Sequence, residues 1–189
     1  MNLFADLWLP VLASAVFVFI ASSILHMLLP IHKGDLAKLE HEDAVLDALR
    51  AQRLESGMYM FPCAGSMKEM GTPEMTAKFK RGPVGFLTIL PNQPPNMGKS
   101  LTLWFLYSVL VSLFVGYLGR LGLEPGEDYR AVFRFTGTAA LMGYALGPIV
   151  DSIWKGVRFS VTAKFIFDGV VYGLVTAGTF GWLWPAAGA

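Results

Sequence analysis

Residues 101–123 read LTLWFLYSVLVSLFVGYLGRLGL, and Arg120 is the only charged residue among them. The hydrocarbon core of a bilayer is about 30 Å thick, so an α-helix needs roughly 20 predominantly apolar residues to cross it. A helix also satisfies its own backbone hydrogen bonds, which lipid cannot do. This stretch therefore predicts a transmembrane helix.

Three other segments meet the same requirement, namely residues 7–29, 131–150 and 162–184, and we expect the third helix to continue to about residue 154. The chain of 189 residues is 54% hydrophobic and 15% charged, with a mean hydropathy of +0.50, unlike an average soluble protein. Its net charge of +1 provides no basic field, so no nucleic-acid partner is expected. The expected fold class is an all-α integral membrane protein with a four-transmembrane-helix bundle.

The predicted spans divide the chain into three parts: helix 1 in residues 1–30, a long cytoplasmic loop in residues 31–100, and helices 2–4 in residues 101–189. The first apolar stretch is too long for a signal-peptide core, so we expect it to be retained. Within the loop, apolar periodicity predicts a short amphipathic helix over about residues 42–55, with Asp43 as its cap and Gly57 as its stop. Residues 84–90 are strand-like and end at Pro91.

The distribution of basic residues predicts the orientation of the spans. Twelve of the fifteen Lys and Arg lie in or beside the first and third connections, which places these connections in the cytoplasm and both chain ends on the periplasmic side. At the opposite face, Arg134 begins the third span, and we interpret it as an anchor that extends to the headgroups. All five tryptophans fall near predicted span ends, as expected for indole at the interface: Trp8, Trp104, Trp154, Trp182 and Trp184.

Small residues at four-residue spacing predict where the helices touch, because close backbone approach drives helix association in lipid. Such stripes are found on the second, third and fourth predicted helices. They are Ser108, Ser112 and Gly116; Ala139, Gly143 and Gly147; and Gly169, Gly173 and Ala177.

A few ionisable residues fall inside the predicted spans, where each costs a few kcal/mol on insertion scales and is a functional candidate. Asp168 lies about one turn inside the fourth helix, with Lys164 four residues before it and Tyr172 four residues after it. Asp151 ends the third helix and His26 ends the first. These five residues form the predicted set of intramembrane polar positions.

Two interpretations of these residues remain open. In the first, His26, Asp151 and Asp168, with His32 from the loop, converge on one buried site for a metal, a proton or a small cation. In the second, Asp168 pairs with Lys164 or with a neighbouring helix, Asp151 caps its own helix and His26 faces the interface. Spacing does not decide, because His26 and His32 are six residues apart, unlike the i, i+4 pair of a helical zinc motif.

Four stretches of the chain are similar to small bacterial membrane proteins that have no assigned activity. They are FDGVVYG at residues 167–173, TAGTFGWLWP at 176–185, GSMKEM at 65–70 and MGKSL at 97–101. The resemblance implies a bacterial inner-membrane location. It implies no catalytic residue, and the sequence leaves any cofactor unknown.

No complete catalytic motif is found in the sequence, so the leading hypothesis is a non-enzymatic accessory or assembly subunit of a larger membrane complex. Its loop would contact membrane lipid or a partner protein. One alternative is a small homo-oligomeric transporter or ion-coupled permease that uses Asp168, Asp151 and His26. A second alternative is a metal-binding membrane enzyme.

Overall fold

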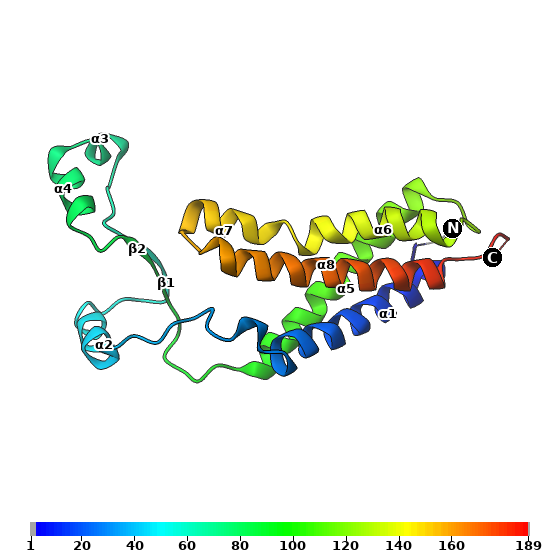
Figure 1. Cartoon of the computed structure of the whole chain (residues 1–189), viewed down its shortest axis with the longest axis horizontal. Helices are drawn as coiled ribbons and strands as arrows, with labels where there is room; N and C mark the ends of the chain where they lie inside the picture. The colour runs from blue at the N-terminus through cyan, green and yellow to red at the C-terminus, as the bar shows by residue number, and fades with distance from the viewer. Residues whose placement is uncertain (1–2, 189) are drawn as a thin grey trace. The chain divides into compact units, whose positions relative to one another are not determined.

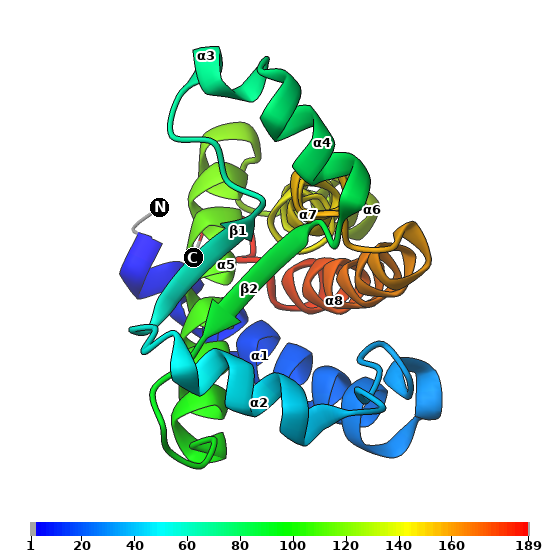
Figure 2. The ribbon, with the colours of Figure 1, turned by 90° about the vertical axis from the view of Figure 1, so that its left-hand side faces the viewer.

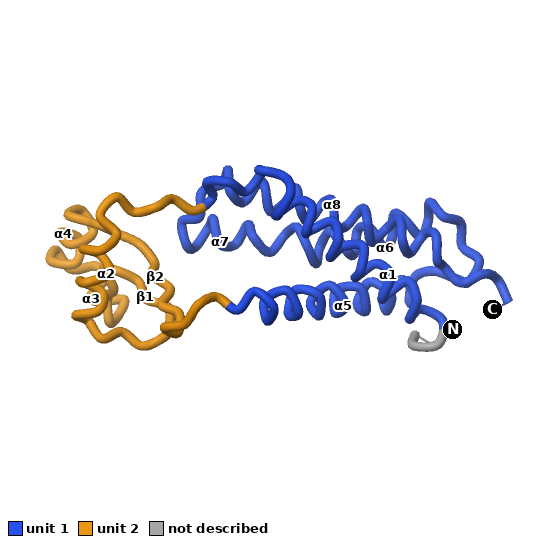
Figure 3. Tube along the Cα trace, turned by 90° about the horizontal axis from the view of Figure 1, so that it is seen from below, with its two compact units in different colours: residues 1–35, 96–189 blue, residues 36–95 orange. Residues whose placement is uncertain are grey.

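The computed structural model describes residues 3–188, and the chain forms two compact units (Figure 3). The first unit contains the chain up to Asp35 and again from Asn96 onward, and the second contains Leu36–Pro95. Five long or medium helices belong to the first unit: α1 Leu3–Ser23, α5 Met97–Gly122, α6 Tyr129–Tyr144, α7 Gly147–Lys155 and α8 Phe159–Leu183.

Helices α1, α5, α6 and α8 pack in a closed ring, because α1 and α6 each contact both α5 and α8. The first residues of α1 and the last residues of α8 lie at the same end of this bundle (Figure 1). Three segments are long and apolar enough to cross a membrane: Asp6–Leu28, Met97–Gly122 and Phe159–Leu183. They support a membrane protein, as composition predicted.

The third predicted span does not form one continuous helix. Helix α6 has 16 residues and α7 has nine, and the helical conformation is interrupted between them at Ala145 and Leu146. Pro148 explains the break, because its ring nitrogen cannot donate to the carbonyl of Tyr144 as an unbroken helix requires. Each of the two helices alone is shorter than the roughly 20 residues that a span needs.

The predicted stripes on α5 and α8 lie on buried faces, and Ser112 of α5 shares a 2.7 Å hydrogen bond with Ser14 of α1. The stripe predicted on the third helix lies at a helix contact only in part, because a Cβ at Gly143 would lie 2.9 Å from Val111 of α5 whereas a Cβ at Gly147 would meet no atom within 4 Å. Gly143 and Gly147 are exposed, and the buried face of α6 consists of Val132, Thr136, Gly137, Ala140 and Tyr144.

The second unit contains α2 Glu42–Ala51, β1 Gly57–Phe61, α3 Met67–Met70, α4 Pro73–Arg81 and β2 Gly85–Ile89. The two strands pair antiparallel, with Tyr59 opposite Leu87 (Figure 2). The expectation of an all-α chain was therefore wrong in this unit. Helix α2 also ends before residue 55, and its N-cap is His41 rather than Asp43.

Candidate metal centre

Two histidines are brought together by irregular helical turns at the end of α1. His26 lies in a π-helical turn over Ile24–Leu28, in which the amide of Leu29 bonds to the carbonyl of Ile24. π-Helical turns are rare in proteins, and those that do occur are often found at functional sites. Pro30 then disfavours helical geometry at Leu29, which is extended, and Pro30 begins a 3₁₀ turn that ends at His32. The rings of the two histidines stack with centroids 4.2 Å apart.

Asp168 approaches these rings from α8, where its side chain is only 2% exposed. The next residue, Gly169, allows α8 to pack directly on the junction between α6 and α7. A Cβ at position 169 would lie 2.6 Å from the Cα of Ala145 and 2.7 Å from the carbonyl oxygen of Tyr144. The close packing of the backbones therefore fixes the position of Asp168 relative to the junction of α6 and α7, and the direction in which its side chain leaves α8.

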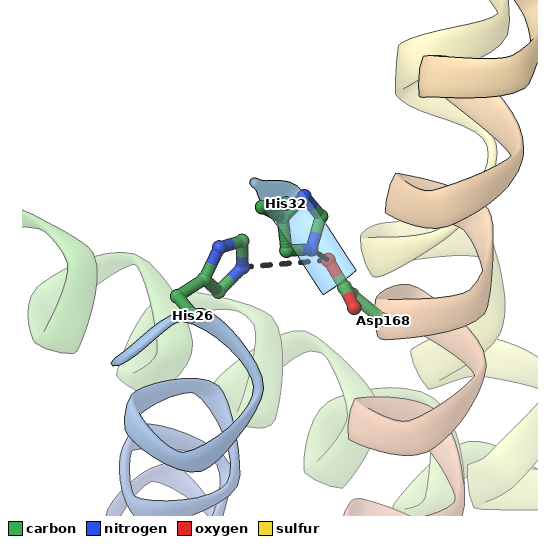
Figure 4. Close-up of side chains that lie close together, drawn as sticks. All are labelled: His26, His32 and Asp168. Atoms are coloured by element: carbon green, nitrogen blue, oxygen red, sulfur yellow. Dashed lines mark ion pairs between the residues drawn. The ribbon is translucent and has the colours of Figure 1, made fainter. Parts of the chain in front are cut away.

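Both imidazoles point at the same oxygen of Asp168 (Figure 4). The Nε2 atom of His32 lies 2.8 Å from Oδ2, and the Nε2 atom of His26 lies 3.3 Å from it. His32 is largely buried, with its side chain 13% exposed, and His26 is 38% exposed. Three potential ligand atoms from three separate turns of the chain thus lie within 4.8 Å of one another.

The far side of His32 is held by a second carboxylate. Nδ1 of His32 lies 2.8 Å from Oδ2 of Asp35, and Oδ1 of Asp35 accepts a hydrogen bond from Nζ of Lys164. The hydrogen bonds from Lys164 and from His32 hold the pKa of Asp35 below its usual value. Asp35 is therefore an ionised carboxylate, which only accepts hydrogen bonds, so Nδ1 of His32 is the donor.

This arrangement leaves an unusual contact on the other ring nitrogen. A neutral His32 that donates through Nδ1 carries no proton on Nε2, and this nitrogen lies 2.8 Å from a carboxylate oxygen. Among the described residues, His32 Nε2 and both oxygens of Asp168 have no hydrogen-bond partner. Buried polar groups are normally paired, and two facing acceptors repel unless a proton or a metal ion lies between them.

The two nitrogen–oxygen separations are compatible with a bound transition-metal ion. Zinc binds imidazole nitrogen and carboxylate oxygen at about 2.0–2.2 Å, which sets neighbouring ligand atoms roughly 2.8–3.6 Å apart for angles between 90° and 109°. The 3.3 Å contact of His26 lies in this range, and the 2.8 Å contact of His32 lies at its lower limit. A small outward movement of the His32 ring would admit the ion. Asp35 then supplies the outer carboxylate that orients many metal-binding histidines.

A pocket of about 610 Å³ opens beside the three residues, and both His26 and Asp168 line it. The remaining walls come from the end of α1, the first half of α5, the junction of α6 and α7, and α8. These walls are mostly apolar and aromatic, and include Met27, Leu101, Trp104, Tyr107, Tyr144, Phe165 and Tyr172. An ion at the centre would therefore have a coordination position that a bound molecule can reach.

Comparisons with protein-family models, with curated proteins and with solved structures find no match to this chain.

The other predicted polar residues lie elsewhere or have other partners. Asp151 pairs with Lys155 at 2.7 Å on the exposed side of α7 and lies outside the cluster. Lys164 bonds to Asp35 rather than to Asp168. Tyr172 lines the pocket one turn after Asp168, and Arg134 is exposed on α6.

Asp35 is the residue that the sequence interpretation missed. Its position three residues after His32 was a usable signal, because residues at this spacing meet within a single turn. The partner Lys164 is 129 positions away, and no local pattern connects the two.

Proposed function

We propose that this membrane protein binds one divalent transition-metal ion through His26, His32 and Asp168. As in catalytic metal sites, coordination positions on the ion would stay open for water or substrate. Two histidines and one carboxylate are a ligand set that both zinc enzymes and non-haem iron enzymes use, and both leave coordination positions open for water or substrate. The observation that carries the proposal is the contact of two imidazole Nε2 atoms with one buried carboxylate oxygen that has no hydrogen-bond partner among the described residues.

The same observation favours a metal over a simple ion pair. One protonated histidine would use one of the two contacts to Asp168, whereas a divalent cation uses both. The transport hypothesis loses support because Asp151 pairs with Lys155 and does not join His26 and Asp168. An accessory subunit without a ligand gives no reason for a buried carboxylate to face two ring nitrogens.

We further propose that the protein crosses the bacterial inner membrane four times, with the metal centre near the cytoplasmic face. The joined helices α6 and α7 extend along α8 from end to end. Before α6, the carbonyl of Glu124 accepts a hydrogen bond from Trp184 at the end of α8. After α7, Arg158 donates to the carbonyl of Gly34 beside the centre. The basic residues of the first and third connections support the cytoplasmic orientation.

The test is metal analysis of protein purified in mild detergent without a histidine tag. We expect inductively coupled plasma mass spectrometry to find about one equivalent of zinc or iron per chain. His26→Ala and Asp168→Asn should each lose this metal, because two remaining ligands do not hold an ion stoichiometrically.

The matched control is His41→Ala, since His41 is the third histidine of the chain and lies in the other unit. This variant should keep the full metal content. Wild-type protein that stays metal-free after incubation with Zn²⁺ and with Fe²⁺ under reducing conditions would contradict the proposal and return the accessory-subunit hypothesis to first place.

A further inference from the structure

We infer that the pocket beside the metal centre binds a lipid with a single apolar chain, and that the anionic oxygen headgroup of this lipid occupies the open position on the metal. The inference rests on the proposed metal function and names its substrate class. It is carried by the lining of the pocket, by its place on the apolar helices and by the charge of the centre.

The size and the lining of the pocket fit an apolar chain. Its volume of about 610 Å³ lies within the range of roughly 300–1,000 Å³ that small-molecule pockets occupy. Aromatic and aliphatic side chains form most of the wall, and Trp104 stands in it with its ring nitrogen already bonded to Ser22 at 2.8 Å. Contact between an apolar wall of this kind and a hydrocarbon chain has a lower free energy than contact between the wall and water.

The pocket is accessible from the lipid-facing side of the helices. Its lining includes Met27 at the end of α1, which is 75% exposed, and Phe165 of α8, which is 40% exposed. Both belong to segments that are apolar enough to cross a membrane. A molecule that enters past these side chains comes from the bilayer, where single-chain amphiphiles partition.

The inner end of the pocket selects an anionic oxygen. A divalent ion and Lys164 carry three positive charges, and Asp168 with Asp35 carry two negative ones, so the centre keeps one net positive charge. Tyr172 also lines the pocket, one turn along α8 from Asp168. Its hydroxyl is buried and has no hydrogen-bond partner among residues 3–188, so it can donate to a headgroup oxygen that reaches it.

Tryptophan fluorescence gives a direct test, because Trp104 forms part of the wall and bromine quenches indole at contact distance. The metal-loaded protein is placed in nanodiscs of unbrominated phosphatidylcholine and titrated with 9,10-dibromostearic acid. The same titration of Trp104→Phe measures the quenching of the other four tryptophans, and the difference reports Trp104 alone. We expect this difference to saturate and to be reversed by unbrominated stearic acid.

Two further conditions separate the headgroup from the chain. Removing the metal with a chelator should weaken binding at least tenfold, and methyl stearate, which lacks the anionic charge, should compete at least tenfold less well than stearic acid. Gly147→Phe should abolish the saturable quenching and keep the metal, because Gly147 lines the pocket and a Cβ there meets no atom within 4 Å. Metal content is measured on every variant as a check of folding.

The outcomes distinguish this inference from the proposed function. Full metal content with Trp104 quenching that rises linearly with bulk lipid would overturn the lipid inference and leave the metal centre standing. Saturable quenching that is unchanged by the chelator would overturn the headgroup contact. Protein that binds no metal would remove the proposed function, and the inference with it.

Discussion

At the scale of single residues, Asp35 is the residue whose effect is easiest to isolate. It does not touch the proposed ion, yet it holds the ring of His32 through Nδ1 and is itself held by Lys164. Outer carboxylates of this kind orient the ring and raise the basicity of its other nitrogen, and their loss costs about 10–100-fold in metal affinity. Asp35→Asn should weaken zinc binding by that factor while leaving the binding stoichiometry at one ion.

The measurement is a competition titration against a chromophoric chelator. Asp151→Asn is the matched control, because it removes a carboxylate that also pairs with a lysine, but on the exposed side of α7. Exposed pairs contribute little, so its zinc affinity should equal that of the wild type. Equal affinity of Asp35→Asn and wild type would show that Asp35 merely ties the loop to α8.

At the scale of elements, the contact between α8 and the junction of α6 and α7 sets the position of Asp168. A Cβ at position 169 would overlap backbone atoms of Tyr144 and Ala145, which cannot rotate away as a side chain can. Gly169→Ala should therefore lower the free energy of unfolding by about 1–3 kcal/mol, a typical cost of overpacking. Its metal affinity should fall as well, because the shift displaces the neighbouring carboxylate.

Gly178→Ala on the same helix is the comparison for that prediction. A Cβ at position 178 has the hydroxyl of Tyr129 at 3.7 Å as its nearest atom, which is ordinary contact. Its unfolding free energy should stay within about 0.5 kcal/mol of the wild type. Denaturant titration in mixed micelles measures both variants, and equal stabilities would contradict the close-packing argument.

Much of the helical architecture could be predicted from the sequence, because a length of apolar residues is a local property. The three candidate spans overlap the predicted segments around residues 7–29, 101–123 and 162–184. Pro148 in the third segment indicates a bend, but the hydropathy of the segment predicts one span and gives no sign of the break between α6 and α7. Strand β1 was missed because its apolar residues lie in a Gly-, Pro- and Met-rich stretch.

The centre itself was predicted only as one of two interpretations. His26, His32 and Asp168 were named as candidates, but so was Asp151, which the structure places elsewhere. The pairing of Lys164 was interpreted from its four-residue spacing to Asp168, and this local rule lost to a contact with Asp35 across the fold. Which side chains meet depended on the turn at Pro30, and that turn is not visible in the spacing of the histidines.

At the scale of the whole molecule, the proposal of four membrane crossings makes a prediction about which parts of the chain share a side. Cys63 is the only cysteine, is exposed, and lies in the connection between α1 and α5. Ala186 lies beyond α8 and is also exposed. If α6 and α7 together cross the membrane, one crossing separates the chain start from Cys63 and four separate it from Ala186, so the two positions lie on opposite sides.

Labelling with a membrane-impermeant maleimide tests this arrangement in intact bacterial cells. The native thiol of Cys63 should react only after the inner membrane is permeabilised, whereas the thiol of the double variant Cys63→Ser, Ala186→Cys should react in intact cells. If both thiols react in intact cells, or both react only after permeabilisation, then α6 and α7 do not cross the membrane. Three crossings by α1, α5 and α8 would leave Cys63 and position 186 on the same side. The opposite labelling pattern would keep four crossings, invert the orientation and move the metal centre to the periplasmic face.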